Sequence, residues 1–456
     1  MKEENFLKGK TRKDYELLMP AGDMEKAKYA IAFGADAIYC GIPMFTLRGK
    51  SSMNLSDVAK IIPYAHDRGV KVYLAVNIFP HSFKYEQFMI DMKKMVDMKP
   101  DAFIMADPGL IDLTLENFPE AEVHLSVQAN NVNWMSVKFW QKQGVTRVVL
   151  ARELTLKEVE IIHEKVPKME LEFFIHGSNC MAYSGRCLLS NYMNYRDSNQ
   201  GVCNNACRFQ YKVYKSDDPN YMETMQEERN YKELSKGSYF VEEQLRKGEL
   251  YEVQEDESGT YIFNAKDNCM VEHIEKLMKA GVCSYKVEGR TKSVYYAAIV
   301  ARVYRKVFDD ILAGKTPDID SAIAELNTTS NRGFVPGFLE GNPKDNAIYY
   351  EKKTSNQTHL FAGIVRKVIS SSEKKSIIEV EARSKFDIGD ELEFVFPTEV
   401  KLWKATNISK PVLNGEDIKL ESASGGLEFN VKLEVPFEVK DEYCVIRRKL
   451  KTGEIA

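Results

Sequence analysis

The stretch YELLMPAGDMEKAKYAIAFGADAIYCGI, residues 15–42, places two short apolar runs on either side of a segment long enough for a helix. The first run covers residues 15–20 and the second covers residues 37–42. Both are largely apolar rather than strictly alternating, which is typical of strands buried on both faces of a parallel sheet. The stretch therefore predicts a strand–helix–strand unit.

The same alternation of apolar runs and helical patterns continues to about Phe308. Further apolar runs occupy residues 70–79, 102–107, 122–128, 145–151, 169–177 and 283–289. Together with the first two runs these make eight strand–helix alternations, which is the pattern of a (β/α)8 barrel. A doubly wound sheet is the alternative, because a sequence does not show whether the sheet closes.

Helix signals lie between the apolar runs. Residues 56–68 form an amphipathic pattern with Ser56 as the expected N-cap, Gly69 as its end, and Pro63 as a site of kinking or of a shifted start. Thr155 and Glu158 have the spacing of a capping box, which predicts the start of another helix. A long helix is expected over residues 292–314.

The regular alternation breaks between residues 177 and 282, where the chain is rich in cysteine and then polar. A segment of this length is too long for a simple connection between two strands. It therefore predicts an insertion after the seventh strand, at the barrel rim where active sites of this architecture lie. Alternating runs from 357 to about 450 predict a small closed β-barrel. We therefore predict a (β/α)8 barrel over 1–325 that includes the insertion, a linker over 326–356, and a C-terminal β-barrel over 357–456.

Composition places the chain among soluble globular proteins. It has 456 residues, of which 44% are hydrophobic and 29% are charged, and its length predicts two or three domains. It contains no run of eighteen apolar residues, and the charged N-terminus has no apolar signal region, which predicts a cytoplasmic protein with no membrane span. The net charge of −4 argues against wholesale coating of nucleic acid but allows a local basic patch.

Cysteine usage is the most specific chemical signal in the chain. In a reducing compartment the eight cysteines need an explanation other than disulfides, and Cys40, Cys283 and Cys444 lie in apolar runs that predict buried thiols. Four others share the spacing C-x6-C-x15-C-x3-C, which lacks the paired C-x2-C knuckles of zinc ribbons and suits a cubane iron–sulfur cluster. Structural zinc and inert thiols are the alternatives. These four are Cys180, Cys187, Cys203 and Cys207.

Polar residues follow the apolar runs at points where strand ends should converge on a pocket. The alternative is that they serve only as helix caps and rim salt bridges. Among them, a buried Arg290 beside Glu288 would form a fixed fork for a carboxylate or phosphate. His176 could orient substrate, donate to cluster sulfur, or be a satisfied rim histidine. The candidates are Asn77, Asp107, Gln128, Arg152, Glu153, His176, Arg186, Glu288, Arg290 and Lys292.

Long motifs resemble the collagenase-like peptidase family U32. They are LLMPAGDMEKAKYAIAFGADAIYCG (17–41), EFFIHGSNCMAYSGRCLLS (172–190), RDSNQGVCNNACR (196–208), SYFVEE (238–243), TYIFNAKDNCM (260–270) and AGVCSYKVEGRTKSVYYAA (280–298). One departure is Asn179, where the family usually has an apolar residue. The resemblance covers nearly the whole chain.

The resemblance implies a function other than proteolysis. The best-understood members of the family look like RNA and quinone hydroxylases that hold an oxygen-sensitive [4Fe–4S] cluster. Within it, the chain is most similar to the branch implicated in making 5-hydroxyuridine at the tRNA wobble position, with prephenate as a candidate hydroxyl donor. This implies tRNA and a small carboxylate as partners, the four spaced cysteines as ligands, and Cys269 in reserve, with Cys40 a more distant candidate.

Two other function classes stay open at this point. A peptidase would need a nucleophile, but the sequence has neither a GxSxG elbow nor an HExxH helix, so a Cys–His dyad would have to come from distant residues. A non-catalytic RNA-binding or cluster-delivery protein is the third class. The basic segment IRRKLK, residues 446–451, could grip an RNA backbone or be a solvated basic end.

Overall fold

The computed structural model describes most of the chain. It covers residues 6–47, 49–180, 182–183, 186–203, 207, 265–343, 356–412, 415–440 and 443–454. Between residues 214 and 261 it describes short strands. These are β8 Tyr214–Lys215, β9 Lys232–Glu233, β10 Tyr239–Glu242, β11 Leu250–Asp256 and β12 Gly259–Tyr261.

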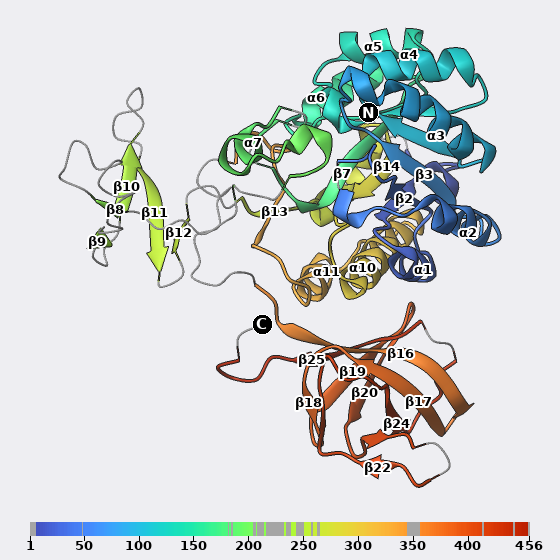
Figure 1. Cartoon of the computed structure of the whole chain (residues 1–456), viewed down its shortest axis with the longest axis vertical. Coiled ribbons are helices and arrows are strands. Elements are labelled where there is room, and N and C mark those ends of the chain that lie inside the picture. Colours follow the sequence, from blue (N-terminus) through green and yellow to red (C-terminus); the bar gives the residue numbers. More distant parts are fainter. Residues whose placement is uncertain are drawn as a thin grey trace.

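The eight predicted apolar runs form a closed parallel barrel (Figure 1). Strands β1 to β7 pair in chain order, and β14 pairs in parallel with both β1 and β7, which closes the cylinder. Closure confirms the (β/α)8 prediction over the doubly wound alternative. The strands are β1 Glu16–Pro20, β2 Ala37–Gly41, β3 Lys71–Val76, β4 Ala102–Met105, β5 Val123–Leu125, β6 Arg147–Val149, β7 Glu170–Ser178 and β14 Val282–Val287.

Helices surround the barrel and bury their apolar faces against it. In α2 the N-cap is Asn54 rather than the expected Ser56, because the Asn54 Oδ1 accepts from the Asp57 backbone N–H at 2.9 Å. The helix continues past Pro63 to His66, and the capping box of Thr155 and Glu158 is confirmed. In the part of the chain that the structure describes, the helices around the barrel are α1 Met24–Ala32, α2 Leu55–His66, α3 Tyr85–Asp97, α4 Pro108–Asn117, α5 Trp134–Lys142, α6 Leu156–Lys165, α9 Ile274–Lys279, α10 Val294–Leu312 and α11 Ile319–Leu326. A further short helix, α7 Leu189–Asn194, lies in the cysteine segment.

The sheet extends beyond the barrel at one strand. β13 (Asp267–Cys269) pairs antiparallel with the end of β7, and β15 (Phe334–Val335) pairs in parallel with β13. The predicted insertion over 177–282 is thus tied to the barrel at its end, and β15 brings part of the predicted linker to the same edge. Among the residues that the structure describes, none of the helices combines the length and apolar composition that crossing a bilayer requires.

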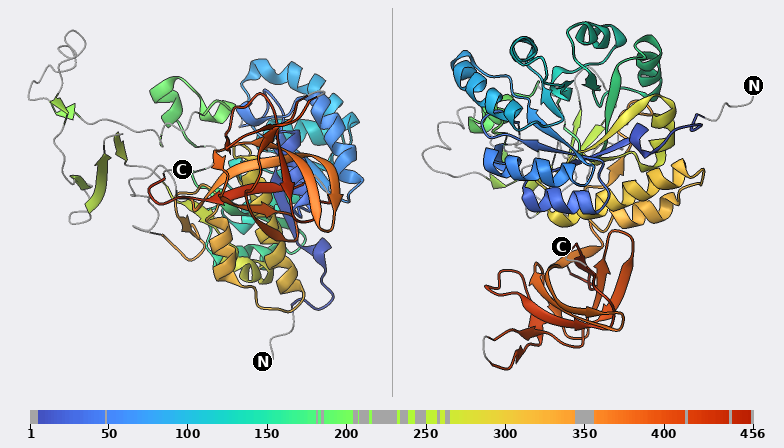
Figure 2. Two further views of the ribbon diagram at one scale, coloured as in Figure 1. Left: turned by 90° about the horizontal axis from the view of Figure 1, so that it is seen from below. Right: turned by 90° about the vertical axis from the view of Figure 1, so that its right-hand side faces the viewer.

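The C-terminal strands form a curled antiparallel sheet with its own apolar core, which lies beside the barrel (Figures 1 and 2). Phe386 and Phe394 are fully buried in this core. The strands of this sheet are β16 His359–Ser372, β17 Lys375–Ala382, β19 Glu391–Val395, β20 Val400–Lys404, β21 Ser409–Lys410, β22 Ile418–Lys419, β24 Val431–Val435 and β25 Val445–Lys449. β18 Phe386–Asp387 and β23 Ser422–Ala423 pair with each other as a separate two-stranded sheet.

Both arginines of the basic segment 446–451 are buried, and Arg447 contacts the barrel domain. The Arg447 guanidinium contacts the Glu393 carboxylate of its own domain at 2.6 Å and the Glu325 carboxylate of α11 at 2.9 Å. Arg448 is equally buried and contacts Glu454 at 2.7 Å. Because both arginines are held in ion pairs, neither presents its guanidinium to an RNA backbone.

Replacing Arg447 should weaken the interface between the domains. We expect Arg447→Met to lower the free energy of unfolding by about 3–5 kcal/mol, because it leaves two carboxylates without their buried partner. Urea unfolding at pH 7 measures the change. The control Lys375→Met removes an exposed ion pair with Glu434 in the same domain and should cost less than about 1 kcal/mol. Equal losses would contradict the assigned role of Arg447.

Candidate active site at the barrel mouth

The carboxyl ends of the barrel strands enclose a cavity of about 70 Å³. Five of the predicted polar residues meet there, which follows from their place directly after parallel strands. These five are Asn77, Gln128, Arg152, Glu288 and Arg290. Asn77 is held by two hydrogen bonds: its Nδ2 donates to Ser126 Oγ at 3.2 Å, and its Oδ1 accepts from the Leu47 N–H at 3.3 Å.

Arg290 packs closely against two glycines, Gly41 and Gly22. Its Nη1 donates to Thr46 Oγ1 at 2.8 Å, and its guanidinium lies 5.7 Å from the centre of the Tyr39 ring. A Cβ on Gly41 would lie 2.1 Å from that Nη1, and a Cβ on Gly22 would lie 2.0 Å from the Arg290 carbonyl oxygen. Both positions therefore need glycine for Arg290 to occupy this place.

Lys286 is a cavity residue that was not among the candidates predicted from the sequence. It points into the barrel from β14, and its Nζ donates to Glu172 Oε1 at 2.7 Å and lies 4.5 Å from the centre of the Tyr39 ring. Burial lowers the pKa of Lys286. Burial would raise the pKa of Glu172, but the charges of Lys286 and Arg147 outweigh it and hold that pKa below its usual value.

A network of buried charges continues from this pair to the opposite end of the barrel. Arg147 Nη1 contacts Glu16 Oε1 at 2.6 Å and Glu172 Oε2 at 3.5 Å. The Tyr73 and Ser284 hydroxyls donate to the same Glu16 carboxylate at 2.6 and 2.8 Å. Because every charge in the network has a partner, the barrel interior holds Lys286 in one place below the mouth.

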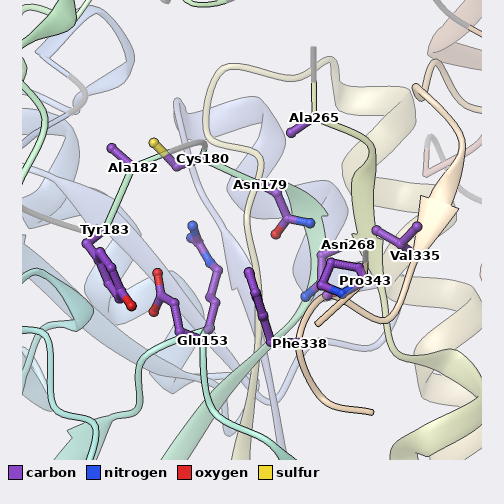
Figure 3. A pocket seen from close by; sticks show the side chains of 12 residues that line it. Glu153, Asn179, Cys180, Ala182, Tyr183, Ala265, Asn268, Val335, Phe338 and Pro343 are labelled. Carbon is purple, nitrogen blue, oxygen red and sulfur yellow. The ribbon is translucent and has the colours of Figure 1, made fainter. Parts of the chain in front are cut away.

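A second cavity, of about 220 Å³, is shown in Figure 3. It adjoins the first through Arg152, which lines both. The cysteine segment reaches the barrel here, since Asn179, Cys180 and Tyr183 line this cavity. The Asn179 Nδ2 donates to the Lys266 carbonyl at 3.3 Å, so the departure from the family pattern ties the segment to the strand edge. The remaining lining residues are Glu153, Ala182, Ala265, Asn268, Val335, Gly337, Phe338 and Pro343.

The four spaced cysteines differ in how far they are exposed to solvent. Cys180 is exposed, while Cys187, Cys203 and Cys207 are half-buried. Within the described part of the chain, no three His, Cys, Asp or Glu side chains come together as a set that could hold a metal. Residues 184–185 and 204–206, which adjoin these cysteines, lie outside the described residues. The iron–sulfur ligand set therefore stays a prediction.

His176 is a buried residue of β7 and lines neither of the two cavities. Its Nδ1 is 3.2 Å from the Tyr304 hydroxyl, which also lies 3.7 Å from the Sγ of Cys269, the residue opposite His176 on β13. Burial lowers the pKa of His176 to about 3 and raises the pKa of Cys269 to about 11. A Cys–His nucleophile needs a thiolate of lowered pKa, so this pair does not support peptidase chemistry.

Three further candidates lie away from both cavities. Asp107 is the N-cap of α4, with its Oδ1 accepting from the Leu110 N–H at 3.0 Å, because a carboxylate satisfies the unpaired N–H groups of the first turn. The Lys292 Nζ donates to the Ser330 carbonyl at 3.3 Å, and Arg186 is exposed. Of the predicted buried thiols, Cys40 and Cys444 are confirmed as buried and Cys283 is half-buried.

A closed parallel barrel with convergent polar side chains at the carboxyl ends of its strands is the arrangement of (β/α)8 enzymes. The chain belongs to Peptidase family U32, whose family model matches residues 22–349.

Relatives in this family carry names of different activities. The chain is 43% identical to "tRNA hydroxylation protein P" of Escherichia coli (strain K12), over 96% of this chain and 97% of that protein. It is 29% identical to a 23S rRNA 5-hydroxycytidine synthase of the same strain, over 87% of this chain and 54% of that protein. It is also 29% identical to "Collagenase" of Porphyromonas gingivalis, over 84% and 87% of the two chains.

The Glu172–Lys286 pair should make stability depend on pH. We expect Lys286→Met to lower the free energy of unfolding at pH 7 by about 3–5 kcal/mol. The pKa of Glu172 is depressed in the folded protein, so its contribution is present above the unfolded carboxyl pKa of about 4.3 and is lost as pH falls through the folded value. In the variant, burial raises the pKa of Glu172 with less positive charge to oppose it, so the carboxylate takes up a proton well above pH 4 and the deficit should shrink from pH 7 to pH 4.

Urea unfolding at both pH values measures this deficit. Lys93→Met, which removes an exposed pair with Asp97, serves as the control and should cost less than about 0.5 kcal/mol at pH 7. A deficit of the same size at pH 4 and pH 7 would mean that lost packing, rather than the ion pair, causes the loss.

Proposed function

We propose that this protein is an RNA-modifying enzyme that hydroxylates C5 of uridine at the wobble position of tRNA. The relative that is 43% identical over nearly the whole chain, and is named for tRNA hydroxylation, supports this proposal. The hydroxylated pyrimidine in the name of the rRNA relative supports the same base chemistry. A tRNA substrate implies that the protein is located in the cytoplasm. The base must leave its stack to reach the barrel mouth, as in other enzymes that act on a base.

The observation that carries the proposal is the gathering of three cationic side chains, Arg152, Lys286 and Arg290, against one carboxylate, Glu288, around the smaller cavity. Its volume of about 70 Å³ suits a small anionic group. Guanidinium groups bind carboxylates through paired hydrogen bonds. We therefore assign this cavity to the carboxylate of a hydroxyl-donating acid such as prephenate.

The overall reaction then balances without a further oxidant. Uridine C5 exchanges its hydrogen for the hydroxyl group of the acid, so uridine loses two electrons. The acid gains these two electrons together with the hydrogen. The residues of the smaller cavity bind and orient the acid, and the adjoining cavity leaves room for the base.

We also propose that Cys180, Cys187, Cys203 and Cys207 hold a [4Fe–4S] cluster, which would supply one-electron chemistry. The position of Cys180 supports this proposal, since this residue lines the cavity that adjoins the cationic one. Cys269 is the reserve ligand, because it lies on β13 at the same strand edge.

Loss of the guanidinium at the smaller cavity should abolish hydroxylation. We expect Arg290→Ala to reduce 5-hydroxyuridine in tRNA at least about 100-fold when the variant replaces the wild type in a strain lacking the gene, because the acid loses a charged, paired contact. Nucleoside mass spectrometry measures the product. Arg68→Ala, at an exposed arginine after α2, should retain wild-type product. Wild-type protein that yields no product would overturn the proposed function.

Iron content should follow the four spaced cysteines. We expect about four iron and four sulfide ions per chain after anaerobic purification, and a loss of most of both on replacing Cys180 and Cys187 by serine. Iron and sulfide assays with visible absorption measure this without reference to activity. Cys444→Ala is the control, and Cys269→Ser tests the reserve ligand. Equal iron in the wild type and the double variant would contradict the ligand set.

A further inference from the structure

The larger cavity contains two hydrogen-bond acceptors without donors. Among the described residues, Glu153 Oε2 and Asn268 Oδ1 are buried and have no hydrogen-bond partner. Asn268 is only 3% exposed, and both residues line the cavity (Figure 3). A buried acceptor that lacks a donor is costly, and such groups commonly mark a place where a ligand or water binds.

The chemical identity of both acceptors is well defined. The Asn268 Nδ2 donates to the Phe174 carbonyl at 2.9 Å, which fixes the amide so that its Oδ1 is the unpartnered atom. An ionised carboxylate, as Glu153 provides, only accepts hydrogen bonds. The cavity therefore calls for a ligand that brings two donors.

The size and lining of the cavity fit a flat ring. A cavity of about 150 Å³ is enough to bind benzene. The volume of about 220 Å³ therefore admits a six-membered pyrimidine ring, whereas the smaller cavity, at about 70 Å³, does not. Tyr183 and Phe338 line the larger cavity with exposed aromatic faces, on which a base can stack.

We propose that the larger cavity is the specificity pocket for the flipped uridine, with Glu153 accepting from the base N3–H and Asn268 accepting from the ribose 2′-hydroxyl. This inference rests on the proposed function. A uridine within an RNA strand carries these two donors, which matches the two unpartnered acceptors. Cytosine presents an acceptor at N3, so its nitrogen would face the Glu153 carboxylate without a hydrogen between them. The pocket therefore selects uridine over cytidine and RNA over DNA.

Binding of modified RNA hairpins to the wild-type protein tests the proposal without any risk of misfolding. The probes are an anticodon stem–loop with uridine at the wobble position and the same hairpin with N3-methyluridine, cytidine or 2′-deoxyuridine there. We expect N3-methyluridine and cytidine to weaken binding about tenfold or more, because each loses a hydrogen bond to a charged group. The deoxyuridine hairpin should bind about two- to tenfold more weakly. Equal affinity for all four hairpins overturns the proposal.

Two variants then assign each donor to its acceptor. Glu153→Gln presents an amide that can donate to the cytosine N3, so the preference for uridine over cytidine should fall to about threefold or less. Asn268→Ala should remove the difference between the ribose and deoxyribose hairpins while keeping the preference for uridine. Glu160→Gln, at an exposed position of α6, is the matched control and should keep both preferences. Variants that weaken binding of all hairpins equally would contradict the assignment.

The outcomes separate this inference from the proposed function. If the wild type makes 5-hydroxyuridine but Glu153→Gln keeps the full preference for uridine, the pocket assignment is wrong and the function stands. If the hairpin preferences appear as expected but no hydroxylated product forms, the pocket stands and the hydroxylase proposal fails.

Discussion

The buried ion pair between Glu172 on β7 and Lys286 on β14 is the contact on which the mouth of the barrel depends. These two strands close the cylinder, so the pair lies across the seam that makes the sheet a barrel. Two charges in an apolar interior are costly unless each is paired, and here Arg147 extends the pairing to Glu16 on β1. The same network that closes the barrel therefore positions the Lys286 ammonium below the mouth.

This arrangement gives the protein two neighbouring cavities of different character. The smaller one is lined by three cations and one carboxylate, Glu288, so cationic side chains outnumber anionic ones around it, which suits an anionic group. The larger one is mainly bounded by apolar and aromatic side chains, with two buried acceptors, so it suits a flat polar ring. Arg152 lines both cavities, and its guanidinium lies 4.0 Å from the centre of the Phe174 ring. A base in the larger cavity and a small acid in the smaller cavity would thus lie on opposite sides of the Arg152 side chain.

Much of the site follows from the rule that parallel strands bring their carboxyl ends together. Asn77, Gln128, Arg152, Glu288 and Arg290 come after apolar runs, and all five line the smaller cavity. The rule fails at Asp107, since a carboxylate after a strand can also cap the next helix, and a sequence does not distinguish the two uses. Lys286 was missed because it lies within an apolar run, and only the partner Glu172 makes a lysine stable there.

The order of strands and helices was determined by the sequence alone, because burial of continuous apolar runs and capping of helix ends are local properties that neighbouring residues specify. Which distant side chains meet was decided only by the tertiary structure. Asn268 faces the cavity because β13 turns back along β7, and Arg447 is interior because two domains dock around it. Such contacts join residues far apart in the chain, and their charge balance and geometry exist only once the barrel has closed.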